Sequence, residues 1–174
     1  MSRKNLVAPD VGCPPLLIRQ VRIPTASVLT LNATPFLLVP GPGGLTQATY
    51  TTAIAAGPMQ KQTKALFFEK AIVNVVKGSG AGTAYDNGGD GLRVQYQGGG
   101  TAVSFVFTDP LNAATAGTLF VLNRCGTDLS TEAAPASLTP NKGLELTNVT
   151  AEVTTGTHDL IVTTFYRIIE LKGT

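Results

Sequence analysis

The sequence predicts an all-β domain, a two-sheet antiparallel sandwich of the jelly-roll type with about eight strands and at most one or two short helices. Glycine and proline supply 19 and 11 of the 174 residues, more than the average of about 12% for the two types together. Hydrophobic residues still make up 43%, which argues against disorder. Many turns between short strands account for both values, and eight strand-like segments without a repeat period favour a sandwich.

The length of the chain indicates a single domain with its own core. Residues 1–15 are polar and contain proline without hydrophobic periodicity, so we expect an extended N-terminal arm followed by one β-sandwich domain over residues 16–174. No hydrophobic run reaches about 18 residues, so no transmembrane helix is expected. Prolines interrupt any signal-peptide core near the N-terminus, and we expect the chain to fold in the cytoplasm of the cell that makes it.

The first two strands are expected at Leu16–Ile23 and Val28–Val39. Neither face of the first is cleanly apolar, as in a strand pressed between partners. The second is expected to break or bulge near Asn32–Pro35. It ends where Pro40 begins a Pro/Gly stretch that a strand entering a loop tolerates and a helix does not. Leu45–Lys64 is then a long excursion with at most a helical turn.

The middle of the chain contains three further strands. Ala65–Val76 is predicted as a strand because β-branched and aromatic residues dominate it, and an interior helix is the alternative. After the glycine-rich connection Gly78–Gly91, the alternation in Leu92–Tyr96 indicates a half-buried strand. Val103–Phe107 is expected to be its hairpin partner.

One short helix and one more strand are expected next. Asp109 and Pro110 suit the N-cap and first position of a helix, and Gly117 suits its C-terminal stop. We therefore expect a short helix at Leu111–Ala116 and a strand at Thr118–Arg124.

The C-terminal part is expected to form a closing hairpin. Thr127–Pro140 is rich in Ser, Thr, Ala and Pro and is predicted as a loop. Gly143–Val153 and Asp159–Leu171 are then paired strands joined by Thr154–His158. Both faces of the last strand are largely apolar, which is typical of a central strand covered on both sides.

Charge is sparse and unevenly distributed. Charged residues make up 14% of the chain, against an average of about 25%, so we expect partner chains to cover much of the surface. The net charge of +2 is too small to propose nucleic acid as a partner. Arg3, Lys4, Arg19 and Arg22 against Asp10 give the first 22 residues a net charge of +3, which suits an acidic surface; a solvated terminus is the alternative.

No residue pattern in the sequence supports catalysis or cofactor binding. His158 is the single histidine and is expected to be a solvated turn residue. Cys13 and Cys125 fit no metal spacing, and whether they pair is left open. Asp86 and Asp90 lie in a glycine-rich loop without the order of a calcium site. We therefore predict no enzyme, no cofactor and no bound metal.

Three aromatic residues leave a binding role open. Tyr96, Phe105 and Tyr166 are of a kind that stacks sugars or bases, but at strand spacing they are expected to fill the core.

Several motifs resemble one protein family. The chain contains Leu-Asn-Ala-Thr-Pro at residues 31–35 and Leu-Val-Pro-x-Pro-Gly at residues 38–43. A glycine-rich segment then precedes Leu-Arg-Val-Gln-Tyr at 92–96, followed by Asn-Lys-Gly-Leu at 141–144 and a closing segment at 159–168. In this order they resemble small proteins encoded beside the major capsid protein of tailed phages. The excursion at Leu45–Lys64 is longer than the family pattern.

The resemblance implies a jelly-roll decoration protein that binds the outside of the capsid as a trimer. Its partner is then the major capsid protein, its location the virion surface, and its working parts the arm and two loops. The arm spans Arg3–Arg22 and contributes Arg3, Lys4, Arg19 and Arg22 as capsid contacts; the loops are Leu45–Lys64 and Thr127–Pro140. The alternative is a trimeric fibre or host-attachment domain that binds glycans.

Overall fold

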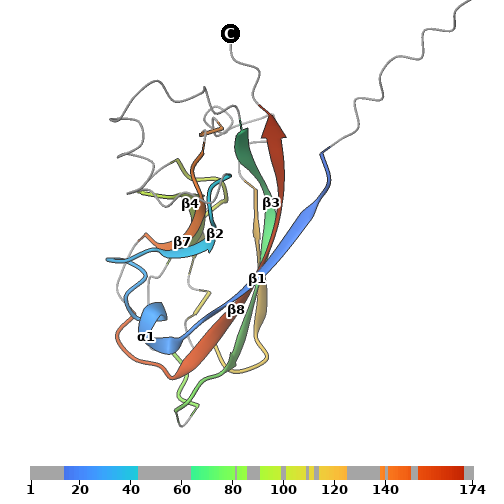
Figure 1. Ribbon diagram of the computed structural model, residues 1–174. Helices are drawn as coiled ribbons and strands as arrows, with labels where there is room; N and C mark the ends of the chain where they lie inside the picture. Colours follow the sequence, from blue (N-terminus) through green and yellow to red (C-terminus); the bar gives the residue numbers. More distant parts are fainter. Residues whose placement is uncertain are drawn as a thin grey trace, which may run out of the picture.

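A computed structural model describes the molecule at residues 14–42, 64–80, 82–85, 91–98, 101–108, 110–111, 114–124, 138–139, 141–149 and 153–170. These residues form two antiparallel sheets of four strands each, which confirms the all-β sandwich (Figure 1). In chain order the elements are β1 (Leu17–Ile23), α1 (Thr25–Val28), β2 (Phe36–Val39), β3 (Lys64–Lys77), β4 (Gly91–Tyr96), β5 (Phe107–Thr108), β6 (Leu119–Asn123), β7 (Leu144–Asn148) and β8 (His158–Glu170).

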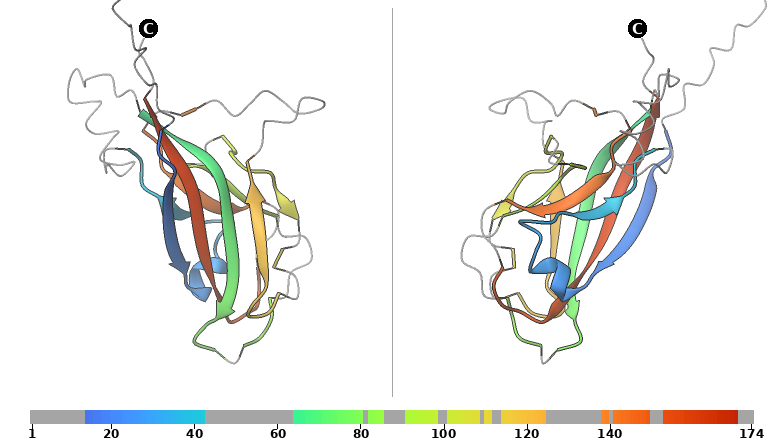
Figure 2. Two further views of the ribbon diagram at one scale, coloured as in Figure 1. Left: turned by 90° about the vertical axis from the view of Figure 1, so that its right-hand side faces the viewer. Right: turned by 60° about the vertical axis from the view of Figure 1, so that its left-hand side comes forward.

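The strand order is that of a jelly roll. One sheet has the order β1-β8-β3-β6 and the other β2-β7-β4-β5 (Figure 2). Within these sheets β1 pairs with β8, β2 with β7, β3 with β6 and β4 with β5. The first four strands therefore pair with the last four in reverse, as in one long hairpin rolled around a core.

The core fills the space between the two sheets. Successive side chains on a strand point to opposite faces, so every second residue enters the core. In β8, for example, Leu160 and Val162 are fully buried, whereas Ile161 between them is only half-buried. Buried residues from both sheets form one hydrophobic cluster, as expected for a single domain core.

A bulge in β3 changes which residues of that strand are buried. Phe68 lies opposite Tyr166 and Lys70 opposite Phe165, so Glu69 is an extra residue in the pairing with β8. Before the bulge Phe68 enters the core, and after it Ala71 and Val73 do. The buried residues therefore change from even to odd positions at the bulge, which explains why the sequence of this segment shows no regular alternation of hydrophobic and polar residues. The predicted strand is confirmed and the helix alternative is wrong.

The predicted second strand is wrong over its first part. Val28 ends α1, residues 29–34 form turns and a bend, and the strand is confined to β2. The start of the predicted strand is instead taken up by α1. Thr25, the first residue of α1, binds Asp159 through its amide N and Oγ1, both at 2.9 Å from Oδ1. The Leu29 amide then donates to the Thr25 carbonyl at 3.0 Å, which closes a helical turn in place of a strand.

The predicted closing hairpin is also wrong. β7 pairs with β2 and β4, whereas β8 pairs with β1 and β3 in the other sheet. The connection between them therefore crosses the edge of the sandwich. β7 is also shorter than the predicted Gly143–Val153, and Val153 instead contributes to the core.

The segment after β4 departs from the predicted alternation. The β4–β5 hairpin exists, but its regular pairing covers Gly91–Leu92 with Phe107–Thr108 only. Ser104 bridges Arg124 beyond the end of β6, and its hydroxyl donates to the Phe105 carbonyl at 2.9 Å. Ser104 is therefore buried, whereas Phe105, expected to fill the core, and Phe107 are about two-fifths exposed; Val103 is buried.

The predicted helix at Leu111–Ala116 is not formed by its described residues. Leu111 and residues 114–117 are turns or irregular. The Ala114 amide donates to the Leu111 carbonyl at 2.9 Å and Leu111 is fully buried, so a turn that buries this side chain replaces the helix. Gly117 ends the segment in a turn with φ of 96°.

Candidate interaction surface

The outer face of the β1-β8-β3-β6 sheet carries many hydrophobic side chains, which lie among polar ones such as Gln20, Asn74 and Thr163. Their positions follow from the strand register, because each alternates with a residue that points into the core. We call this set the outer apolar face: Ile18, Phe67, Ile72, Val76, Leu119, Val121, Ile161, Phe165 and Ile169. None of the nine belongs to the core cluster, and each is half-buried or exposed.

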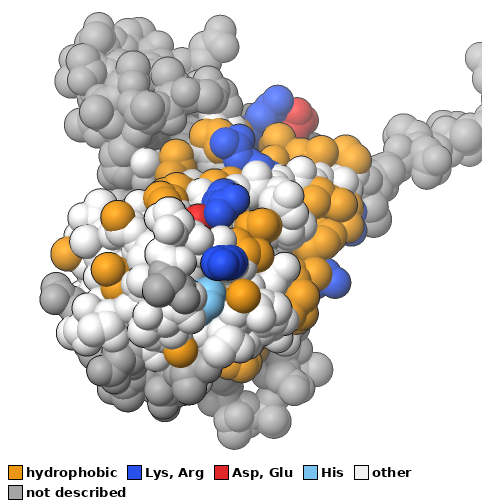
Figure 3. Space-filling model, turned by 90° about the horizontal axis from the view of Figure 1, so that it is seen from below, with side chains coloured by type: hydrophobic (Ala, Val, Ile, Leu, Met, Phe, Trp, Pro, Cys, Tyr) orange, Lys and Arg blue, Asp and Glu red, His pale blue; other side chains and the backbone are white. Residues whose placement is uncertain are grey.

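The residues of the outer apolar face lie in neighbouring rows across the sheet. Ile18 is paired with Phe165, and Ile72 with Val121. Exposure is greatest toward the sheet edges, with Ile18 at 62% and Leu119 at 60%. Figure 3 shows hydrophobic side chains along the right-hand side of the molecule, where this sheet lies in Figure 1. A monomer in water would expose this surface to solvent.

Two cations lie directly on aromatic rings of this face. Lys70 Nζ is 5.0 Å from the ring centroid of Phe165, and Arg124 Cζ is 4.4 Å from that of Phe67. Both distances suit cation–π attraction. Neither side chain has an ion pair with a carboxylate in the described part of the chain.

Two other cations of this face are paired. Arg167 Nε lies 2.8 Å from Glu69 Oε1, so the residue that forms the bulge in β3 also supplies an ion-pair partner. Arg22 Nη2 lies 2.7 Å from Asp159 Oδ2. With Lys70 and Arg124 added, the face has four basic and two acidic side chains.

Asp159 anchors α1 and β1 to the start of β8. It accepts hydrogen bonds from Arg22 Nε at 2.8 Å and from the amide and hydroxyl of Thr25. Burial acts to raise the pKa of Asp159, but the hydrogen bonds from Thr25 and Arg22 and the charge of Arg22 outweigh it. The pKa therefore lies below its ordinary value.

His158 lies at the end of the sandwich where β8 begins. It is the first residue of β8 and is only 2% exposed, so the prediction of a solvated turn residue is wrong. The Tyr85 hydroxyl donates to the His158 carbonyl, and the two rings lie 6.2 Å apart. Burial, with the charge of Asp159, raises the pKa of Tyr85, which keeps this hydroxyl protonated and donating.

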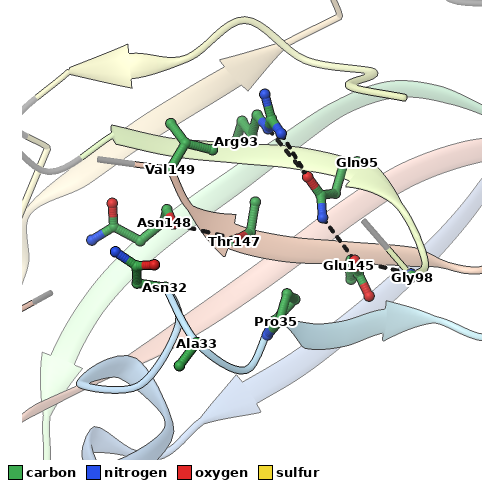
Figure 4. A pocket seen from close by; sticks show the side chains of 10 residues that line it. All are labelled: Asn32, Ala33, Pro35, Arg93, Gln95, Gly98, Glu145, Thr147, Asn148 and Val149. Atoms are coloured by element: carbon green, nitrogen blue, oxygen red, sulfur yellow. Dashed lines mark hydrogen bonds between the residues drawn. The ribbon is translucent and has the colours of Figure 1, made fainter. Parts of the chain in front are cut away.

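The other sheet has a polar outer face with a groove of about 560 Å³ between β4, β7 and residues 32–35 (Figure 4). Arg93 donates to Gln95 Oε1 from Nε and NH2, at 3.2 and 2.9 Å. Gln95 in turn donates to Glu145 Oε1 at 2.8 Å, and the Gly98 amide donates to the same oxygen at 3.2 Å. These polar groups form hydrogen bonds with one another, so the side chains in the groove stabilise the sheet itself.

The same face fixes the segment that carries the Leu-Asn-Ala-Thr-Pro motif. Thr147 Oγ1 donates to the Leu31 carbonyl at 3.2 Å, and the Asn148 amide does so at 3.3 Å. Leu31 is fully buried. The motif therefore joins α1 to β2 and closes the sandwich over one edge of the core.

The structure describes two of the four predicted contact residues, Arg19 and Arg22. Arg3 and Lys4 lie outside the described residues. Arg19 and Arg22 have opposite parity on β1, so they point to opposite faces of the sheet. Arg22 is bound to Asp159, and Arg19 is exposed. The loops Leu45–Lys64 and Thr127–Pro140 also fall outside the description, apart from residues 64 and 138–139.

Other predicted features have mixed outcomes. Tyr96 and Tyr166 contribute to the core as expected, whereas Phe105 does not. Cys13, Cys125 and the two aspartates of the glycine-rich loop, Asp86 and Asp90, lie outside the described residues. Within the described residues, no three of the His, Cys, Asp and Glu side chains gather as metal ligands, and no helix is long and apolar enough to cross a membrane.

One feature of the sequence points indirectly to the outer apolar face. Both faces of the last strand are apolar, and this strand is β8 at the centre of the sheet. The contributions of β1, β3 and β6 to the face depend on register and on the bulge at Glu69, which no local pattern specifies.

No family model, curated protein or solved structure matches the chain.

Proposed function

We propose that this protein is a structural component of a tailed-phage virion that binds the outside of the capsid, as a trimer, and stabilises the shell. The observation that carries the proposal is the outer apolar face of a sheet whose other face already packs on the core. A protein that works alone in solution gains nothing from such a surface, whereas a protein held against a large assembly does. The sequence motifs described above supply the link to phage heads.

The jelly roll suits this role mechanically. Its two sheets hold a rigid core between them, and capsid proteins are among the proteins that use this architecture. In a trimer, three copies of the same face contact several shell subunits at once. Modest contacts then reinforce one another through effective concentration, and a protein bound to the assembled shell stabilises that state.

The glycan-binding alternative has weaker support. Sugar sites combine polar groups with exposed aromatic rings. The polar groove lined by Arg93, Gln95 and Glu145 has its hydrogen-bonding groups engaged with one another, and the described residues that line it include no aromatic side chain. We therefore favour the shell over a glycan as the partner.

The decisive measurement is the copy number of the protein in purified virions, by quantitative mass spectrometry. We expect hundreds of copies, whereas a handful would indicate a fibre or tail component. Particles assembled without the protein should also lose DNA or rupture at lower temperature than complete particles. Equal heat resistance of the two kinds of particle would contradict the proposal.

The trimer is tested separately on the isolated protein. Light scattering coupled to size-exclusion chromatography should give a mass three times the 18.0 kDa of one chain. A protein that is monomeric both in solution and on the particle would remove the trimer from the proposal but leave shell binding intact.

A further inference from the structure

We propose that the outer apolar face docks onto an acidic protein surface, one with a hydrophobic centre and at least two carboxylates placed to meet Lys70 and Arg124. This inference rests on the proposed function, under which that surface belongs to the capsid shell. It names the chemistry of the partner and assigns the charged contacts to Lys70 and Arg124.

The charge of the face determines the kind of partner. The four basic side chains of this face exceed its two acidic ones by two positive charges. Arg22 and Arg167 are satisfied by Asp159 and Glu69 within the same sheet. The excess therefore resides on Lys70 and Arg124, which lie over the rings of Phe165 and Phe67.

These two cations are held in place before any partner binds. Each rests on an aromatic ring of the same face, so its charged group stays over the hydrophobic surface. A side chain that is already ordered loses less entropy on binding than a free one. A carboxylate that approaches the face meets a fixed cation beside an apolar surface, where the loss of water strengthens their attraction.

The same charges argue against a second copy of this chain as the occupant. Two identical faces packed together would enclose Lys70 and Arg124 from both copies, four cations without matching carboxylates. Like charges brought together in an interface are unfavourable by several kcal/mol.

The test uses the full-length protein and shells assembled without it by the virus that encodes it. Binding is measured by co-sedimentation of the wild type and of the double variant Lys70→Glu/Arg124→Glu. The matched control is Lys142→Glu, which reverses a charge in the loop before β7. The neutral pair Lys70→Gln/Arg124→Gln separates loss of attraction from added repulsion, and thermal melting of each variant checks that it folds.

We expect the double reversal to weaken shell binding on the order of 100-fold, the neutral pair to weaken it less, and Lys142→Glu to leave it unchanged. Binding of the wild type should also fall as NaCl is raised. If the wild type binds shells and the double reversal binds equally well, the inference is wrong while the proposed function stands. If the double reversal alters the oligomeric mass instead, the face joins copies of the chain and the inference is again wrong. Absence of wild-type binding would remove both.

Discussion

At the scale of single residues, the end of the sandwich near α1 depends on close approaches that few side chains allow. Gly156 has φ of 132°, and a Cβ placed on it would lie 2.2 Å from Tyr85 Cδ1. Tyr85 is itself fixed by its hydrogen bond to His158 and is only 2% exposed. The glycine therefore serves both the backbone conformation and the packing of a buried ring.

The substitution Gly156→Ala should destabilise the protein by about 3 kcal/mol, because backbone strain and overpacking against Tyr85 add. Gly82→Ala is the matched control, since Gly82 also has a positive φ, 83°, but has open space around it. We expect only about 1 kcal/mol there. Urea unfolding followed by circular dichroism measures both. Equal losses would show that Tyr85 moves aside without cost.

Asp159 gives the protein a predictable response to acid. Its pKa in the folded protein lies below the ordinary value, so the stabilisation that it provides is complete above the pKa of the unfolded chain, about 3.9. That stabilisation is lost as the pH falls through the lower pKa of the folded state. Its hydrogen bonds to Arg22 and Thr25 hold α1 in place only while the carboxylate is charged.

The variant Asp159→Asn should lose about 2 kcal/mol at neutral pH, because hydrogen bonds to a charged group are replaced by weaker ones. As the pH is lowered below the unfolded-state pKa of about 3.9 and through the lower pKa of folded Asp159, the stabilities of the wild type and the variant should converge. The free energy of unfolding in urea, measured at several pH values, gives this difference directly. A gap that stays constant with pH would show that the charge of Asp159 contributes nothing.

At the scale of elements, the bulge in β3 shows what local sequence can and cannot specify. Its β-branched and aromatic residues are enough to predict a strand at Ala65–Val76. The change of face at Glu69 arises only from pairing with β8. For the same reason, the segment after Thr25 carries strand-like side chains but forms α1 and then turns over residues 29–34, since Asp159, 134 positions later, binds Thr25 and starts α1. Such long-range contacts are invisible to a local pattern.

Deletion of Glu69 should preserve the fold. Phe68 and Lys70 would become neighbours in a regular register, and both would keep their present faces. The expected loss is about 1 kcal/mol, from the ion pair with Arg167. Deletion of Ala71 is the control, because it would force either Lys70 or Asn74 into the core and should cost at least about 3 kcal/mol. Thermal melting distinguishes the two, and comparable losses would contradict this account of the bulge.

At the scale of the whole molecule, the sequence supported the fold class and the approximate strand count but not every pairing. Turn-rich composition with a high hydrophobic content suffices to predict a sandwich. The closing hairpin was wrong because consecutive strands in a jelly roll often lie in different sheets, as β7 and β8 do. The outer apolar face could not be predicted from the sequence either, because it is assembled from four strands between Ile18 and Ile169.

Because the first and last strands pair, the two ends of the described domain lie at the same end of one sheet. Leu17 lies opposite Tyr166 and Ile23 opposite Leu160, so the chain enters β1 and leaves β8 at the same end of the sheet (Figure 2). A force that pulled these ends apart would break the hydrogen bonds between β1 and β8 one after another, starting at that end of the sheet. The domain is therefore weak in tension between its termini, and a mechanical load is better carried through its faces.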